Sequence, residues 1–209
     1  MTRRLAILGA GGHGKVVADT ARESGWEDLM FFDDAAELPR LVGAWPVVGG
    51  FGDLIGALGG FTAVVVAIGD NRVRLAKTRG LLAAGATAVS LVHPRAYVAC
   101  DVQVGPGTVV LAGAVVQPGS RLGAAVIVNT GATIDHDCVL GDGVHVCPGA
   151  NIAGCVSVGE CAWLGIGCSV RQTLTIGAGS VVGGGAAVVA PVPEGVTVVG
   201  VPARSRKKG

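Results

Sequence analysis

The sequence places two of its four histidines close together in a stretch that is otherwise poor in charge. Asp135, His136 and Asp137 are consecutive, and His145 follows nine residues after His136. A histidine between two carboxylates can have its tautomer fixed and its imidazolium stabilised, as a general base requires. A solvated polar turn would use the same residue types, so the triplet alone leaves both interpretations open. It also leaves open whether Asp135 or Asp137 would be the partner of His136.

A second group of polar residues lies near the N-terminus. Segment 9–14 (Gly-Ala-Gly-Gly-His-Gly) follows an apolar run and precedes a helix-like stretch, so it fits a GxGxxG loop. Backbone N–H groups at the start of a helix suit a diphosphate. Asp33 and Asp34 close the next apolar run, and segment 69–71 (Gly-Asp-Asn) follows a third. Ligands of α/β domains bind at the carboxyl ends of parallel strands, so the three segments predict one binding site.

Two other ligands fit parts of this group. A nicotinamide dinucleotide would use the same glycines, but the repeats that begin at Val98 leave room for only half of a dinucleotide fold. A P-loop would use Lys15, but Val16 occupies the position of the Ser or Thr that holds magnesium. Turns without any ligand are a third interpretation. We favour ligand binding, because all three segments follow apolar strands.

The elements that must position these residues fall into two halves. In the first half, apolar runs at 5–8, 29–32 and 62–68 alternate with helix-like stretches at 15–23 and 72–84. This alternation predicts a small α/β domain with a parallel sheet.

The second half has a period of six residues. From Val98 to Val188 an aliphatic residue recurs at every sixth position without a break. The residue two positions before each aliphatic residue is usually small, and glycine often comes directly after the aliphatic residue. Each hexad therefore predicts one short strand and a turn, and three hexads make one coil of 18 residues in a triangular prism. The pair His93-Pro94 suits the junction between the halves, because proline disfavours helix in the residue before it.

The composition argues against several functional classes. The formal net charge is +1, aromatic residues make up 4% and no long basic run occurs, so nucleic acid is not an expected partner. Glycines and His13 interrupt the apolar N-terminus, so we expect no signal peptide, no membrane span and a cytoplasmic location.

The six cysteines form no CxxC pair and are expected to be reduced and to fill the core. The repeats carry few charges, so we expect association to cover their faces.

The repeats resemble those of the hexapeptide acyltransferases, whose prism coils left-handed. Segment 128–154 also resembles the active-site segment of the sugar O- and N-acetyltransferases related to sialic acid biosynthesis and bacterial protein glycosylation. The resemblance implies an α/β Rossmann-like domain at 1–92, then an all-β left-handed parallel β-helix at 93–209 that ends in a C-terminal tail. It also implies a homotrimer with active sites at subunit interfaces. The γ-class carbonic anhydrases use this prism with three zinc-binding histidines, whereas this prism has two, so we expect no metal.

The resemblance also implies roles for individual residues. The histidine of the family's acidic-His-acidic triplet is the proposed base and the acidic residue after it is its partner, which here are His136 and Asp137. The family commonly has glutamate at one or both flanks, whereas this chain has aspartate at both. His145 matches a histidine near the acetyl thioester, and Ile166 and Gly184 match backbone contacts of coenzyme A. The positions that hold the nucleotide match Gly12, His13, Gly14, Lys15, Asp33, Asp34, Gly69, Asp70 and Asn71.

The function implied by the resemblance is transfer of an acetyl group from acetyl-CoA to the amino group of a UDP- or GDP-linked deoxy-aminosugar in bacterial glycan biosynthesis. One alternative is O-acetylation of sialic acid or a related sugar, with the same prism and base. An alternative of another class is a non-catalytic oligomeric scaffold that binds a nucleotide.

Nine residues are half a coil, so His136 and His145 should lie on different sides of one prism and meet most easily across a subunit interface.

Overall fold

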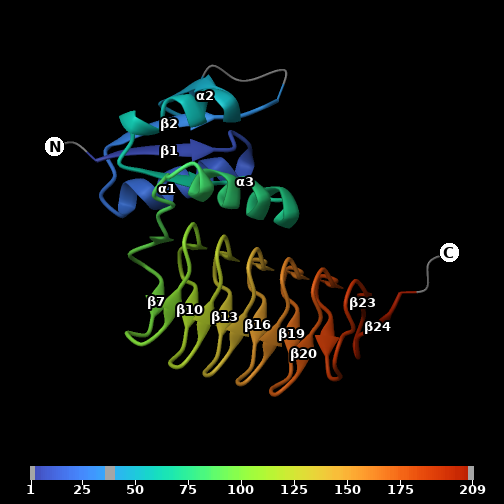
Figure 1. The fold of residues 1–209 in the computed structure, drawn as a ribbon. Helices are drawn as coiled ribbons and strands as arrows, with labels where there is room; N and C mark the ends of the chain where they lie inside the picture. The colour runs from blue at the N-terminus through green and yellow to red at the C-terminus, as the bar shows by residue number, and fades with distance from the viewer. Residues whose placement is uncertain (1–2, 36–40, 207–209) are drawn as a thin grey trace.

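A computed structural model gives the structure of residues 3–35 and 41–206 (Figure 1). An α/β domain packs on the first coils of a long triangular prism, and the later coils extend beyond it. The two architectures predicted from the two sequence periods are therefore confirmed.

The N-terminal domain contains a five-stranded sheet in the order β3-β4-β2-β1-β5. All neighbouring strands are parallel except β3 and β4, which pair antiparallel at one edge. The elements are β1 (Arg4–Leu8), α1 (Gly12–Glu23), β2 (Asp28–Phe32), β3 (Leu41–Val42), β4 (Trp45–Gly49), α2 (Phe51–Gly56), the 3-10 helix η1 (Leu58–Gly60), β5 (Ala63–Val66) and α3 (Asn71–Ala83). The three expected strands and two expected helices are present, whereas the sequence pattern predicts neither the β3–β4 edge nor α2.

Strand β1 is buried on both faces of this sheet. Leu5 and Ile7 pack into one hydrophobic cluster with residues of α1, and Ala6 and Leu8 pack into a second cluster. Alternate residues of a strand point to opposite faces, so a central strand covered on both sides reads as an uninterrupted apolar run. This burial explains why residues 5–8 stand out in the sequence.

Sixteen two-residue strands, β7 to β22, form the walls of the prism, and each ends on an aliphatic residue of the six-residue repeat. From Val110 to Val188 all these aliphatic side chains are buried in one core that runs along the prism. The strands are β6 (Leu91–Val92), β7 (Tyr97–Val98), β8 (Gln103–Val104), β9 (Val109–Val110), β10 (Val115–Val116), β11 (Arg121–Leu122), β12 (Ile127–Val128), β13 (Thr133–Ile134), β14 (Val139–Leu140), β15 (His145–Val146), β16 (Asn151–Ile152), β17 (Ser157–Val158), β18 (Trp163–Leu164), β19 (Ser169–Val170), β20 (Thr175–Ile176), β21 (Val181–Val182), β22 (Ala187–Val188), β23 (Thr197–Val199) and β24 (Arg204–Ser205).

Three sheets form the faces of the prism. The first face contains β7, β10, β13, β16, β19 and β22, and the second contains β8, β11, β14, β17 and β20. The third face runs from β6 and β9 through β12, β15, β18 and β21 to β23 and β24. From β6 to β19 each strand residue pairs with the one 18 positions further on, as Val116 does with Ile134. Residues one coil apart are therefore neighbours on the same face or turn.

Glycines line the turn between the second and third faces because the coils stack closely there. A Cβ at Gly105, Gly123 or Gly141 would lie 2.5 to 2.8 Å from backbone atoms of the next coil. Real Cβ atoms do not approach other atoms so closely, so only glycine fits at these positions.

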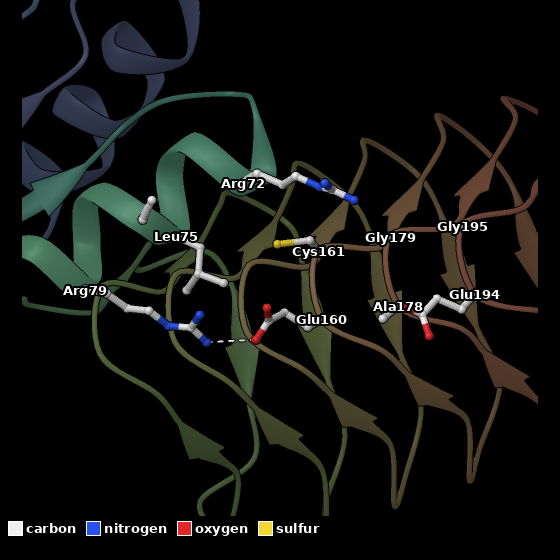
Figure 2. A pocket seen from close by; sticks show the side chains of 10 residues that line it. Arg72, Leu75, Arg79, Glu160, Cys161, Ala178, Gly179, Glu194 and Gly195 are labelled. Atoms are coloured by element: carbon white, nitrogen blue, oxygen red, sulfur yellow. Dashed lines mark hydrogen bonds and ion pairs between the residues drawn. The ribbon is translucent and has the colours of Figure 1, made fainter.

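Helix α3 connects the two domains along these same turns (Figure 2). Arg79 Nη2 lies 2.9 Å from Asp142 Oδ2 and 2.7 Å from Glu160 Oε2. Beside these ion pairs a cavity of about 340 Å³ separates α3 from the later turns, with Arg72 and Glu194 in its lining. The ion pairs are about half exposed, so they stabilise the contact only modestly.

Arg74 forms a buried link between the domains, and its residue surface is 1% exposed. Its guanidinium donates hydrogen bonds of 2.8 Å to the carbonyl oxygens of Ala125 and Gly143 in the prism. It also donates bonds of 3.0 and 3.1 Å to the carbonyl oxygens of Ile68 and Gly69, in the loop before α3. Burial lowers the pKa of Arg74 to about 10, so the side chain is still charged at neutral pH. One cation thus fastens the 68–71 loop to the prism.

The pairing of the prism begins with β6, two residues before the domain start expected at 93. Residues 207–209 of the expected tail lie outside the described residues. Among the described residues, no helix combines the length and apolar character that crossing a membrane requires.

All six cysteines are free. Cys138 and Cys168 are buried in the prism core, as expected, and Cys147 is buried outside that cluster. The core-filling prediction is wrong for Cys100 and Cys155, because both lie in turns and are exposed to solvent.

Candidate active site

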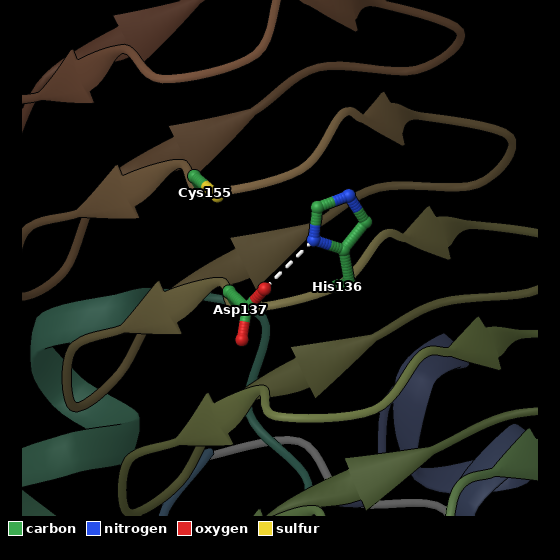
Figure 3. A group of neighbouring side chains, drawn as sticks. All are labelled: His136, Asp137 and Cys155. Carbon is green, nitrogen blue, oxygen red and sulfur yellow. Dashed lines mark hydrogen bonds and ion pairs between the residues drawn. The ribbon is translucent and has the colours of Figure 1, made fainter.

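His136 lies in the turn between β13 on the first face and β14 on the second face, and its side chain is 56% exposed (Figure 3). Its Nδ1 is 2.8 Å from Asp137 Oδ2. When the carboxylate accepts the Nδ1 hydrogen, Nε2 keeps a free lone pair and can accept a proton. Asp135 instead accepts a hydrogen bond of 2.8 Å from the backbone N–H of His136. The carboxylate on the imidazole is therefore that of Asp137.

Two glycines in neighbouring coils leave room for this pair. Gly154 comes 18 residues after His136, and a Cβ there would lie 2.6 Å from His136 Nε2. Gly119 comes 18 residues before Asp137, and a Cβ there would overlap Asp137 Oδ1. The imidazole and the carboxylate thus occupy space that side chains of the adjacent coils would otherwise fill.

The acidic neighbours change the titration of His136. The hydrogen bond to Asp137 raises the pKa of His136 above its ordinary value, and the negative charge of Asp135 adds to the effect. Since both members of the pair are well exposed, water and salt screen much of this interaction. The neutral imidazole, which is the form that can accept a proton, therefore predominates only above the ordinary pKa of histidine.

His145 lies on β15 of the third face, on a different side of the prism from His136, as the half-coil spacing predicts. Its Nε2 is 3.2 Å from Asn129 Nδ2. Trp163, one coil further on, meets the imidazole edge-on with ring centroids 6.4 Å apart. The ring of His13 from the glycine loop is also 6.4 Å from that of His145. The glycine loop of one domain and the third face of the other therefore meet at His145.

Both of these histidines are neutral at neutral pH. Burial, with the nearby charge of Arg74 as the second cause, lowers the pKa of His13 to about 4 and that of His145 to about 3. His13 Nε2 and His145 Nδ1 are buried and have no hydrogen-bond partner of normal geometry among the described residues. Buried polar groups are nearly always paired, so this position suits a polar group of a ligand.

The glycine loop and its partner segments surround a hollow of about 450 Å³ at the carboxyl ends of β1 and β5. Lys77 of α3 also lines the hollow, and its Nζ is 2.7 Å from Asp34 Oδ2. This contact is the main reason why the pKa of Asp34 is lowered. Of the residues expected at a nucleotide site, the lining contains Gly12, His13, Asp33, Asp34 and Gly69.

Three residues of the glycine-loop region differ in what they contribute. Asp33 Oδ2 accepts a hydrogen bond of 2.7 Å from the N–H of Ala10, which fixes the start of the loop. A Cβ at Gly14 would overlap the carbonyl oxygen of Gly9, so this glycine allows α1 to begin close to the end of β1. Lys15 is exposed on the first turn of α1 and lies outside the lining of the hollow.

Asp70 and Asn71 position α3. Asp70 is the N-cap of the helix, since its side chain accepts a hydrogen bond of 2.9 Å from the N–H of Val73. Asn71 is buried, and its Nδ2 donates bonds of 3.1 Å to the carbonyl oxygens of Cys161 and Ala162 in the prism. These two residues therefore hold the 69–71 segment in place, and both border a second hollow of about 320 Å³ beside Trp163.

Ile166 and Gly184 stack one coil apart at the turns between the third and first faces. The side chain of Ile166 is exposed, and its carbonyl oxygen accepts a hydrogen bond of 2.8 Å from Gly185. A Cβ at Gly184 would lie 3.3 Å from that same oxygen, so the glycine keeps this edge flat. Together they extend the edge of the third face beyond His145 and Trp163.

Several residues of this region escape the sequence analysis. Gly154 could have been found by adding one coil length to His136, because the 18-residue register is readable from the repeat. Arg74 and Lys77 lie on α3 among other basic residues, and no pattern separates them from solvated side chains. Asn129 is 16 residues from its partner His145, and that spacing has no meaning until the prism is built.

Comparisons with known proteins agree with this geometry. The family model of the PglD N-terminal domain matches residues 4–81. The acetyltransferase domain of PglB from Neisseria gonorrhoeae FA1090, solved with acetyl coenzyme A, is 42% identical, with a TM-score of 0.94 over 99% of this chain and 100% of that chain. The chain belongs to the hexapeptide-repeat sugar acetyltransferases. It is therefore an enzyme, and its prism is the left-handed β-helix of that family.

Two further members are similar over their whole length. PerB from Caulobacter crescentus, solved with CoA and GDP-perosamine, is 39% identical with a TM-score of 0.94, and the match covers 99% of both chains. WeeI from Acinetobacter baumannii AYE is 30% identical with a TM-score of 0.90, over 98% of this chain and 100% of that chain. The likeness spans both domains, so the α/β domain is part of the shared acetyltransferase architecture.

Proposed function

We propose that this acetyltransferase transfers the acetyl group of acetyl-CoA to the amino group of a nucleotide-linked deoxy-aminosugar in bacterial glycan biosynthesis. The observation that carries the proposal is the imidazole–carboxylate pair of His136 and Asp137, on a chain similar along its entire length to an enzyme solved with CoA and GDP-perosamine. Acetyl-CoA is a cytoplasmic metabolite, so we place the reaction in the cytoplasm.

His136 is the general base of this proposal. The amine nitrogen of the sugar attacks the thioester carbonyl carbon, and Nε2 of His136 takes the proton that the nitrogen loses. The C–S bond then breaks, and the imidazolium returns the proton to the departing thiolate of coenzyme A. Asp137 orients the ring and stabilises the imidazolium through the 2.8 Å contact with Nδ1.

His145 and the edge beyond it receive the thioester in this proposal. Nδ1 of the neutral His145 ring, which makes no hydrogen bond of normal geometry within the described part of the chain, can donate a hydrogen bond to the carbonyl oxygen of the acetyl group. The backbone of Ile166 and Gly184 continues along the same edge and is assigned to the pantetheine of coenzyme A. Because this edge is flat and poor in charge, it suits an extended and largely uncharged chain.

The α/β domain is assigned to the nucleotide. The hollow of about 450 Å³ offers N–H groups at the start of α1, where a diphosphate binds favourably. Asp33, Asp34 and Lys77 supply polar groups for a ribose and a base. His13 lies between this hollow and His145, so a sugar extending from the diphosphate would point its amine toward the prism.

The separation of His136 from His145 supports a homotrimer in which each active site takes one histidine from each of two subunits. Subunit mixing tests this assignment. His136→Ala and His145→Ala variants should each be nearly inactive, whereas trimers reassembled from equal amounts of both should recover about one quarter of wild-type activity, because that share of random interfaces is intact. No recovery from properly mixed trimers would contradict a shared site.

The substrate is tested by measuring acetyl-CoA consumption with UDP-, GDP- and dTDP-linked 4-aminosugars and with free sialic acid. Rapid consumption with one nucleotide-linked aminosugar, and a drop of about 10² to 10⁴-fold for His136→Ala, is the expected result. Consumption with sialic acid alone would favour O-acetylation. Tight nucleotide binding without any acetyl transfer would favour the scaffold.

A further inference from the structure

The exposed thiol of Cys155 lies beside the imidazole–carboxylate pair and has no part in the proposed reaction (Figure 3). One nitrogen of His136, one carboxylate oxygen of Asp137 and the sulfur of Cys155 all lie within 4.8 Å of one another. In the described part of the chain this is the one group of three such side chains with donor atoms this close together. The thiol therefore completes a group of three side chains of metal-ligating type at the proposed base.

The backbone fixes this arrangement. Cys155 follows Gly154 and lies one coil beyond Asp137, and its N–H donates a hydrogen bond of 2.9 Å to the carbonyl oxygen of His136. Both Asp137 and Cys155 have positive φ angles, of 57° and 59°, so equivalent turns present both side chains on the same edge of the prism. The ligand atoms thus come from two turns whose spacing is set by the stacking of the coils.

The donor set selects the kind of ion. A thiolate, an imidazole and a carboxylate together favour Zn²⁺ or a similar borderline ion, and disfavour Mg²⁺ and Ca²⁺, which prefer oxygen ligands. In tetrahedral zinc sites a nitrogen and a sulfur ligand are about 3.5 Å apart, given bonds of about 2.0 and 2.3 Å. The three exposed side chains need to move by only about 1 Å to reach that spacing, and water can supply the fourth ligand.

We propose that His136, Asp137 and Cys155 bind a zinc ion that switches the enzyme off. This inference rests on the proposed function, because it assigns regulation to the same base. A neutral imidazole bound to a metal through one nitrogen carries its hydrogen on the other, so neither nitrogen can accept a proton. The ion also withdraws the carboxylate of Asp137 from the ring. Zinc and acetyl transfer therefore exclude each other at His136.

Cobalt binding tests the site without any assay of activity. Co²⁺ added to the purified metal-free protein should bind at one equivalent per chain, with the absorption band that thiolate-to-cobalt charge transfer produces, and Zn²⁺ should abolish the band. Cys155→Ala should lose it, whereas Cys100→Ala, which removes an exposed thiol two coils before His136, should keep it. A missing band, a band that survives Cys155→Ala, or a band lost in Cys100→Ala would each overturn the site.

Inhibition is measured separately on the most active substrate. Saturating Zn²⁺ should reduce the wild-type rate at least about tenfold, and Cys155→Ala should raise the half-inhibiting concentration by at least about tenfold, since even outer-shell changes cost that much affinity. Millimolar Mg²⁺ should have no such effect. Ala125 already has a positive φ of 54°, so alanine at 155 fits this kind of turn. If cobalt binds through Cys155 but zinc leaves the rate unchanged, the site stands and the switch is refuted. If no substrate is acetylated, the cobalt titration still decides the site while the proposed function fails.

Discussion

Gly154→Ala should lower the activity by displacing the imidazole of His136, although His136 itself is unchanged. A Cβ at 154 would lie 2.6 Å from His136 Nε2 and 2.7 Å from Cε1, whereas ordinary contacts begin near 3.4 Å. The imidazole must therefore withdraw by about 0.8 Å, away from the position that its contact with Asp137 defines. Displacing a catalytic group by about 1 Å can cost on the order of 10²-fold in rate. We expect kcat/KM to fall about 10- to 100-fold.

The fold should tolerate this change. The corresponding turn positions one coil before His136 and one and two coils after Gly154 hold Pro118, Gln172 and Ala190, so the backbone at this corner accepts a Cβ. Gly154 has no positive φ, and His136 is an exposed side chain that can move. The melting temperature should therefore stay close to that of the wild type.

A double-mutant cycle gives the decisive measurement. Steady-state acetyl transfer is compared for the wild type, Gly154→Ala, His136→Ala and the double variant, with Gly59→Ala as a control because nothing lies within 4 Å of its added Cβ. If Gly154 acts through the imidazole, it should cost nothing further once His136 is absent. A full additional loss in the double variant, or an unchanged rate in Gly154→Ala, would refute the reasoning.

Three further outcomes follow from the charges and contacts of the site. Asp137→Asn removes the interaction that raises the pKa of His136, so the acid limb of the kcat/KM profile should shift to lower pH while the plateau falls; an unshifted limb would mean that the carboxylate does not act on the base. Arg74→Met leaves carbonyl acceptors of both domains unpaired, and calorimetry should show a loss of about 3 kcal/mol or more, whereas unchanged unfolding would show that the link is unimportant. His13 and His145 have pKa values lowered to about 4 and about 3 in the folded state, so the unfolded chain binds more protons below about pH 6.5. The free energy of unfolding should therefore be lower at pH 5 than above pH 6.5, by ~2 kcal/mol for each histidine. Melting curves of His13→Gln should show a smaller loss between pH 7 and pH 5 than those of the wild type.

The prism could be predicted from the sequence because its physical determinants are local and repeated. Every sixth residue from Val98 to Val188 must fill the same interior, and each is the second residue of a strand in the structure. The same register predicts that His136 and His145 lie on different sides of the prism, as the structure shows. A period that recurs sixteen times leaves little room for another interpretation.

The contacts between the domains could not be predicted in this way, because they depend on how two independent elements dock. Arg74 reads as one more basic residue of α3, yet its guanidinium donates to the carbonyls of Ala125 and Gly143 in the prism. His13 belongs to a glycine loop that predicts only a phosphate, and nothing in that loop indicates that its ring faces His145 across the domain boundary. Such contacts leave no periodic trace in the sequence.

The contacts between the domains also explain why the pKa values of the two histidines of the prism are shifted in opposite directions. His136 lies in a turn that no other element of the described residues covers, so its acidic neighbours dominate and its pKa rises. His145 lies where the α/β domain covers the third face, so loss of water dominates and its pKa falls to about 3. A general base must be exposed enough to exchange protons, whereas a hydrogen-bond donor to a carbonyl oxygen works best when it is neutral and shielded from water. The docking of the α/β domain on the prism therefore gives two chemically identical side chains the different protonation behaviour that the proposed reaction needs.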